Sequence, residues 1–233
     1  LDGGFDMKRP APVYRLTVTG SMGCGKTHLC REIVRRARRC GIKTEYISTD
    51  IIRAEMLQGS SIPGALRLQR LILQEFGDSL RSKEGGIDRQ ALAALVYSDR
   101  RRLAGLKKVL SPVLNGEISR RIKKTRGLVI LESALAAEEK LLPLTNFNVL
   151  LVDCSRATRL KRLKNGDLPL RQVLKRISLQ FPNHKKARAI QVQQRLAGRG
   201  DFFRIRTDKA GFKENLSRIL TQLSAHFKSG GLS

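Results

Sequence analysis

The residues best suited to phosphate chemistry gather at positions 20–27, which read Gly-Ser-Met-Gly-Cys-Gly-Lys-Thr. This order fits the pattern G-x-x-x-x-G-K-[ST], and it stands between a β-rich run, residues 13–19, and an apolar-periodic helical stretch. Gly20, Gly23 and Gly25 allow a tight turn whose backbone N–H groups point at phosphate oxygens. A glycine-rich turn without a ligand would fit the same letters, but the flanking strand and helix favour a phosphate cradle.

Lys26 and Thr27 close this loop and supply its charge chemistry. Lys26 can reach the β- and γ-phosphates of ATP, which makes it a candidate catalytic residue, and Thr27 can offer its hydroxyl to Mg²⁺. The predicted ATP-binding residues are Gly20, Ser21, Met22, Gly23, Cys24, Gly25, Lys26 and Thr27. A phosphate-binding loop alone does not distinguish kinases from hydrolases or molecular switches. The residues on the acceptor side have to make that distinction.

Two acidic residues are expected to face the loop from neighbouring strands. Asp50 ends the second β-rich run and Glu132 ends the third, and the carboxyl ends of parallel strands share one edge of a sheet. A carboxylate at Asp50 could accept the proton of an attacking hydroxyl or help to hold Mg²⁺. Asp50 could equally cap the helix that begins at Ile51. Glu132 is the second acidic candidate, and we assign it to Mg²⁺ together with Thr27.

Five short β-rich runs alternate with helical stretches and predict the elements that position these residues. The runs are residues 13–19, 44–48, 128–132, 149–153 and 202–207. Their alternation predicts an α/β fold of the P-loop kinase type, a three-layer parallel sheet with helices on both faces, a helical insertion and a lid. The helix after the loop should run through Leu29, Ile33, Val34 and Ala37 and end near Gly41.

The chain between these runs predicts a domain organisation. The stretch between the second and third runs is far longer than a crossover needs, so we predict that residues 62–126 form a helical insertion for the second substrate. Residues 156–199, which are rich in Arg, Lys and Gln, are expected to form a lid. We place the kinase core at residues 13–227, a flexible leader at 1–12 and a flexible tail at 228–233.

Composition excludes several classes of protein. The chain has 233 residues, 46 Lys and Arg against 20 Asp and Glu, a formal net charge of +26, and 41% hydrophobic residues. This is enough apolar material for a core, and no apolar run approaches the roughly 20 residues of a membrane span. The four cysteines form no C-x-x-C pair, so we expect reduced thiols. A cytoplasmic monomer without membrane contact is predicted.

Motifs outside the loop resemble those of the dephospho-coenzyme A kinase family across nearly all of residues 13–208. Residues 47–55, Ile-Ser-Thr-Asp-Ile-Ile-Arg-Ala-Glu, are similar to the family's I-D-A-D-x-I-A-R-E, in which the second Asp, here Asp50, is the proposed general base. Residues 86–92 resemble its G-x-(L/I)-D-R-x-x-L stretch. Residues 176–182, Arg-Ile-Ser-Leu-Gln-Phe-Pro, resemble its lid motif R-I-x-x-Q-x-P, which is the most distinctive of these.

The resemblance implies a reaction and its site. Members of this family phosphorylate the ribose 3′-hydroxyl of dephospho-CoA, so ATP and dephospho-CoA are the implied substrates and Mg²⁺ the implied cofactor. The lid is expected to place Arg162 and Arg176 on the ATP phosphates, with Arg162 also catalytic, because a guanidinium grips phosphate oxygens bidentately. Ser48, Ser111-Pro112 and residues 132–138 depart from the family's letters. These departures indicate either a reshaped binding site for the adenine or pantetheine arm of the substrate or relaxed selection on activity.

The charge excess leaves two alternatives open. Basic clusters lie at residues 35–39, 100–102, 120–126 and 156–164. A solvated helix face explains each cluster taken alone, but their sum would attract a polyanion such as RNA at low salt. One alternative is therefore a catalytically altered kinase-like protein that binds nucleic acid or a ribonucleoprotein. The other is a P-loop kinase for another nucleoside or nucleotide.

Overall fold

The computed structural model describes residues 13–59, 61–165 and 170–228. The strands are β1 (Val13–Thr19), β2 (Thr44–Ser48), β3 (Gly127–Glu132), β4 (Val149–Asp153) and β5 (Phe202–Arg206). The helices are α1 (Lys26–Arg39), α2 (Thr49–Leu57), α3 (Ala65–Phe76), α4 (Arg89–Ser98), α5 (Arg100–Lys124), α6 (Arg156–Lys164), α7 (Leu170–Ser178), α8 (Asn183–Ala197) and α9 (Phe212–Lys228), with short turns η1 (Asp78–Leu80) and η2 (Leu142–Thr145). The predicted leader, residues 1–12, and the predicted tail after Lys228 lie outside the described residues.

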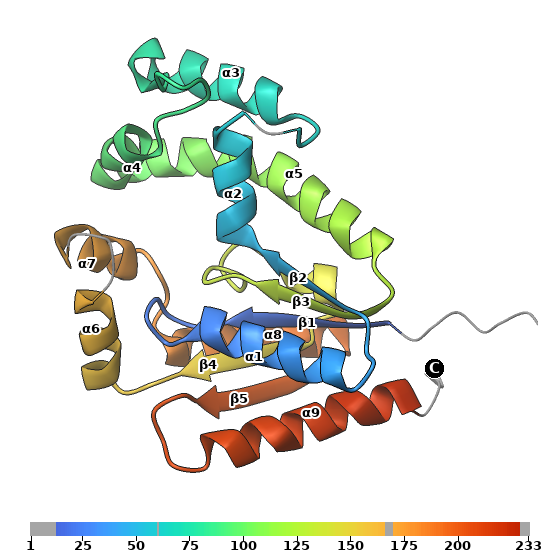
Figure 1. The fold of residues 1–233 in the computed structure, drawn as a ribbon. Helices are drawn as coiled ribbons and strands as arrows, with labels where there is room; N and C mark the ends of the chain where they lie inside the picture. Colours follow the sequence, from blue (N-terminus) through green and yellow to red (C-terminus); the bar gives the residue numbers. More distant parts are fainter. Residues whose placement is uncertain (1–12, 60, 166–169, 229–233) are drawn as a thin grey trace, which may run out of the picture.

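The five strands join one parallel sheet in the order β2-β3-β1-β4-β5 (Figure 1). Every residue of β3, which lies between β2 and β1, is buried, as expected for a strand covered by helices on both faces. Ser48, Glu132 and Val18 lie in register across β2, β3 and β1, so the carboxyl ends of these strands share one edge. The predicted strands are confirmed to within one residue at each end.

Helices α1 and α9 cover one face of the sheet (Figure 1). Leu29 and Ile33 of α1 are buried with Leu16 of β1, Ile130 of β3 and Leu216 of α9 in one cluster. The apolar residues of α1 recur at the helical period, which places them on a single stripe that faces the sheet. The amphipathic helix predicted after the loop is confirmed.

Helices α5 and α8 cover the opposite face. Ile118 and Ile122 of α5 and Ile190 of α8 are buried with Val129 and Val149 of the sheet in a second cluster. Helices therefore lie on both faces of a parallel sheet, and the predicted three-layer α/β fold is confirmed.

The packing of α8 corrects part of the predicted lid, residues 156–199. Lys186 and Ile190 of α8 are fully buried, and α8 packs against β4. Helix α8 therefore belongs to the core domain and not to a lid, because the sheet covers its inner surface. A lid formed by α6 and α7 stays a prediction.

A helical unit of α2, α3, α4 and the first part of α5 stands beside the sheet (Figure 1). Met56 of α2, Leu68 and Ile72 of α3, and Leu114 of α5 are buried in the same cluster as one face of the sheet. Because α2 takes part in this packing, the unit begins before the predicted insertion, residues 62–126. Its role in binding a second substrate stays a prediction.

The described α-helices range from 9 to 25 residues in length. The 25-residue helix α5 is the longest of them, and it carries charged residues such as Arg101, Arg120 and Lys124 along its length. Among the described helices, none combines the length and apolar character that a bilayer crossing requires. The cytoplasmic location and the monomeric state stay predictions.

Candidate active site

The glycine-rich loop between β1 and α1 has the backbone that its sequence requires. The φ angles of Gly20, Gly23 and Gly25 are +146°, +81° and +85°, a region that residues with a side chain rarely adopt. A Cβ on Gly20 would lie 2.2 Å from the carbonyl oxygen of Val152, and one on Gly25 would lie 3.1 Å from the Arg162 guanidinium. The loop therefore follows the end of β4 closely, at the amino end of α1, where backbone N–H groups favour an anion.

Thr27 and Glu132 meet at this loop. The Thr27 hydroxyl donates to Glu132 Oε1 at 2.7 Å, and the Tyr46 hydroxyl donates to Glu132 Oε2. The Glu132 carboxylate is buried, with 8% of the residue exposed, and both of its oxygens are hydrogen-bonded. Lys26 Nζ donates to the Ser21 carbonyl at 3.3 Å. The predicted residues Lys26, Thr27 and Glu132 thus lie at one place in the structure.

Tyr46 is a residue of this site that the sequence analysis missed. Its burial and its hydrogen bond to Glu132 raise the pKa of Tyr46, so its hydroxyl stays protonated and fixes the carboxylate. The alternation of β2 places Tyr46 and Ser48 on the same side of the strand, two residues apart. That alternation was the available signal, because Ser48 lies in register with Glu132.

Asp50 lies in the first turn of α2 and not at the end of β2, which ends at Ser48. The Ser48 hydroxyl accepts from Ile51 N at 3.5 Å and caps the helix, so the alternative role of Asp50 as the cap is wrong. The Asp50 side chain is 79% exposed and lies 3.5 Å from the Arg53 guanidinium. Its carboxylate is therefore open to a substrate at the strand edge that bears Glu132.

Arg162 of α6 reaches the loop through Thr207. The guanidinium donates to Thr207 Oγ1 at 2.8 Å and to the Thr207 carbonyl at 3.3 Å, and Thr207 Oγ1 in turn donates to the Cys24 carbonyl at 2.9 Å. A Cβ on Gly23 would lie 2.8 Å from Leu163, so α6 lies directly against the loop. The phosphate contact predicted for Arg176 on α7 lies outside what the structure describes.

Asn183 and Gln180 hold the start of the loop from the entry to α8. Asn183 Oδ1 accepts from Ser21 N and from Ser21 Oγ, both at 2.9 Å, while Gln180 Oε1 accepts from Met22 N at 3.2 Å. The Asn183 amide donates to the Val152 carbonyl at 3.2 Å. Sequence reasoning missed Asn183, although it follows directly after the motif at residues 176–182.

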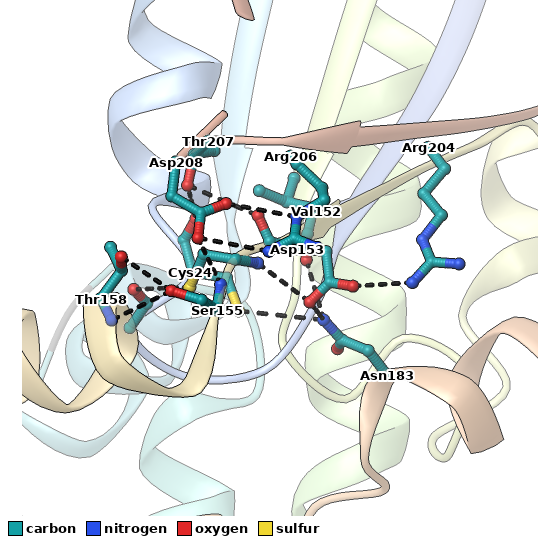
Figure 2. A network of polar contacts seen from close by, with 12 residues as sticks. Cys24, Val152, Asp153, Ser155, Thr158, Asn183, Arg204, Arg206, Thr207 and Asp208 are labelled. Carbon is teal, nitrogen blue, oxygen red and sulfur yellow. Dashed lines mark hydrogen bonds and ion pairs between the residues drawn. The ribbon is translucent and has the colours of Figure 1, made fainter. Parts of the chain in front are cut away.

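Asp153 at the end of β4 joins this network (Figure 2). It accepts from Asn183 Nδ2 at 2.7 Å and from the Arg204 guanidinium at 2.7 Å. Burial opposes its ionisation, but the hydrogen bonds from Arg204 and Asn183 outweigh burial and lower the pKa of Asp153. Close by, Asp208 accepts from Ser155 N at 2.6 Å. Side chains thus tie the ends of β4 and β5 to the loop.

The turn after β3 links α8 to α2. Lys186 of α8 is fully buried, and its Nζ donates to the Ala134 carbonyl at 2.6 Å and to Glu138. Burial lowers the pKa of Lys186 despite this carboxylate partner. The adjacent Glu139 accepts from the Arg53 guanidinium. The neighbouring carboxylates of Glu138 and Glu139 therefore bind α8 and α2 to the same turn.

The donor set suits a metal ion that arrives with a nucleotide. Within residues 13–59, 61–165 and 170–228 no three His, Cys, Asp or Glu side chains gather into a metal cluster. Mg²⁺ in phosphate-transfer sites takes most of its ligands from phosphates and water and needs only one or two protein oxygens. The hydroxyl of Thr27 and the carboxylate of Glu132 are oxygen donors of that kind, side by side at the loop.

A glycine-rich loop at the carboxyl edge of a parallel sheet, with helices on both faces, gives this chain an α/β fold of the P-loop kinase type. The family model for dephospho-CoA kinase matches residues 14–194. The chain belongs to the dephospho-CoA kinase family.

Curated relatives and solved structures agree with this membership. The chain is 26% identical over 182 residues to a dephospho-CoA kinase of Frankia casuarinae, covering 77% of this chain and 74% of the relative. It is 29% identical over 174 residues to one of Dehalococcoides mccartyi, covering 72% and 81%. A solved structure from Thermus thermophilus has a TM-score of 0.64 at 24% identity, covering 94% and 98%. The dephospho-CoA kinase from Campylobacter jejuni has a TM-score of 0.54 at 20% identity, covering 91% and 98%, so both structures share the fold.

Proposed function

We propose that this protein transfers the γ-phosphoryl group of ATP to the ribose 3′-hydroxyl of dephospho-CoA, forming coenzyme A and ADP. Membership of the dephospho-CoA kinase family supports this reaction. The observation that carries the proposal is the 2.7 Å hydrogen bond between Thr27 and Glu132. It joins the end of the phosphate loop to the strand edge that bears Glu132, and Asp50 follows the neighbouring strand β2 in the first turn of α2.

On the donor side, the loop binds the ATP phosphates. The backbone N–H groups of residues 20–27 surround the phosphate oxygens, and Lys26 places its ammonium against the β- and γ-phosphates. Arg162, whose guanidinium lies beside Gly25, adds a planar donor that follows the charge on the transferring group. Both side chains act by stabilising charge that develops during transfer.

Thr27 and Glu132 would hold Mg²⁺, the hydroxyl as a direct ligand and the carboxylate directly or through water. When bound, this ion neutralises charge on the β- and γ-phosphates. The Tyr46 hydroxyl keeps one oxygen of Glu132 engaged, so the carboxylate presents its Oε1 edge towards Thr27. Tyr46 acts through Glu132 and is a positioning residue.

On the acceptor side, Asp50 serves as the general base. The 3′-oxygen forms a bond to the γ-phosphorus, the bond from that phosphorus to the β,γ-bridging oxygen breaks, and ADP leaves with that electron pair. The proton of the 3′-hydroxyl passes to the Asp50 carboxylate, which is 79% exposed in the free protein and is covered once the substrate binds. Helices α6 and α7 then close over the phosphates as the lid.

A coupled assay of ADP release tests this function. We expect ADP formation with dephospho-CoA, and none above the ATP-only background with its 3′-deoxy analogue, which binds alike but lacks the acceptor hydroxyl. Turnover only with another nucleoside or nucleotide would support a different P-loop kinase. ATP binding without turnover on any acceptor would support the catalytically altered protein.

A further inference from the structure

A groove of about 590 Å³ runs beside α1, and Tyr46, the positioning residue of Glu132, is its one link to the site of the proposed reaction. It is lined by Arg31, Val34, Arg35, Arg38, Arg39 and Tyr46. All four arginines are exposed, whereas the two other side chains rest on the buried cluster beneath α1. The groove therefore has a fixed floor and a wall of guanidinium groups.

The acidic residues nearby do not balance this charge. Glu32 forms ion pairs with both Arg35 and Arg36 at 2.6 Å, so one carboxylate serves two guanidinium groups. The Arg38 guanidinium donates to the Thr44 carbonyl at 3.1 Å, a neutral partner. No ion pair recorded among the described residues involves Arg31, Arg38 or Arg39. The groove carries a clear excess of positive charge.

This arrangement costs stability that a bound anion would restore. Arg31, Arg35 and Arg39 follow one another at four-residue intervals on a single helix face. Like charges at that spacing destabilise a helix. A ligand that places phosphate oxygens between the guanidinium groups turns this repulsion into charge-assisted hydrogen bonds.

A second groove extends the surface around the carboxyl end of α1. It has a volume of about 500 Å³ and is lined by Arg36, Arg39, Cys40, Ser217, Leu220, Thr221 and Ala225. Arg39 lines both grooves, so they meet at this residue between α1 and α9. The eight-residue span from Arg31 to Arg39 is about 12 Å along the helix axis, which exceeds a single phosphate group.

We propose that these two grooves bind the phosphodiester backbone of a single-stranded nucleic acid. A chain of regularly spaced phosphates matches a row of arginines, and Tyr46 in the floor is an aromatic side chain, the kind on which nucleic-acid bases stack. A groove does not fit a flat bilayer. The small number of lining residues is also well below the 20 to 30 per side of a stable protein interface.

Binding of labelled single-stranded RNA, followed by fluorescence anisotropy across a salt series, tests this proposal on the full chain. The double variant Arg31→Gln and Arg39→Gln should weaken binding at least tenfold. It should also reduce the slope of log Kd against log salt by about 1.4, because single strands contribute about 0.7 per neutralised phosphate. The matched control, Arg100→Gln with Arg101→Gln in the first turn of α5, removes the same charge and should change Kd less than threefold.

Two further measurements make the result decisive. Lys26→Ala should leave the RNA affinity within twofold, since Lys26 lines neither groove, and thermal unfolding midpoints should match between the two double variants. Equal loss of binding in both double variants, or an equal loss in Lys26→Ala, would overturn the proposal. So would wild-type protein that binds vesicles containing anionic lipid through Arg31 and Arg39 but shows no RNA binding.

Discussion

The phosphate-binding loop and the edge that bears Asp50 differ in how firmly the rest of the chain holds them. The loop is bonded by Asn183, Gln180 and Thr207, which come from α8, its entry and the end of β5. Asp50 stands exposed on the first turn of α2, with Arg53 at 3.5 Å. Hydrogen bonds thus hold the donor side in the free protein, and we expect the acceptor side to obtain its final geometry when dephospho-CoA binds.

The largest expected effect comes from the donor side. Lys26→Ala should slow phosphoryl transfer by about 10³-fold, because it removes a positive charge from the transferring phosphate. Single-turnover rates with saturating ATP measure this step. Lys185→Ala, which removes an exposed ammonium from α8, is the matched control and should leave the rate unchanged. A Lys26→Ala rate within tenfold of wild type would contradict its role.

Asp50→Asn tests whether Asp50 is the general base, separately from any role in nucleotide binding. It keeps the shape of the side chain and removes the proton acceptor, so the chemical step should slow about 10²-fold while ATP affinity changes little. Asp78→Asn is the control, because Asp78 is an exposed carboxylate paired with Arg81 at the same i,i+3 spacing. If ATP·Mg²⁺ binding falls together with the rate, Asp50 is a metal-site residue and not the base.

Asn183→Ala tests whether the loop depends on its distant support. The change leaves Ser21 N–H without its partner and removes one of the two donors to Asp153 Oδ1, which should lower ATP affinity about tenfold and stability by about 1 to 3 kcal/mol. Isothermal titration with an ATP analogue and denaturant unfolding give the two quantities. Asn215→Ala on the exposed face of α9 should alter neither. Unchanged ATP affinity in Asn183→Ala would show that the loop holds its shape alone.

Arg53→Gln tests whether Arg53 supports the acceptor side in particular. Arg53 links the Asp50 helix to Glu139 in the turn after β3, so its loss should raise KM for dephospho-CoA a few-fold and leave KM for ATP unchanged. Arg81→Gln, in the matched surface pair, should leave both constants unchanged. An equal rise in both KM values would mean that the turn supports the whole site and not the acceptor side in particular.

The smallest expected effect is on the pH dependence of folding stability. Because the pKa of Asp153 is lowered in the folded protein, its ionised form stabilises the fold above the unfolded value of about 3.9. That contribution is lost as the pH falls through the lower folded value. The stability difference between wild type and Asp153→Asn should therefore be constant from pH 7 to about pH 5 and shrink below about pH 4. A difference that grows on acidification would contradict the assigned direction.

The sequence predicted the elements with a strong local signal and missed contacts between distant segments. The loop glycines, Lys26 and Thr27 are contiguous, so one motif revealed them together. We expected Asp50 at the end of the second strand, but it lies in the first turn of α2. It follows the β-rich run by only two residues, and Ser48 was not recognised as the cap of that helix. Asn183 was missed because Ser21, its partner in the phosphate loop, lies 162 residues away, at a separation where spacing carries no information. The burial of α8 was missed because few large apolar residues mark it.

Transfer between the two sides is the central claim, and rapid-quench single turnover with γ-labelled ATP measures it most directly. With dephospho-CoA present, the account predicts that the label appears in coenzyme A, in an amount equal to the active sites. The 3′-deoxy analogue should receive none. Label that appears as inorganic phosphate at one rate, whether or not dephospho-CoA is present, would contradict the account, because the loop would then serve hydrolysis and Asp50 would have no acceptor to activate.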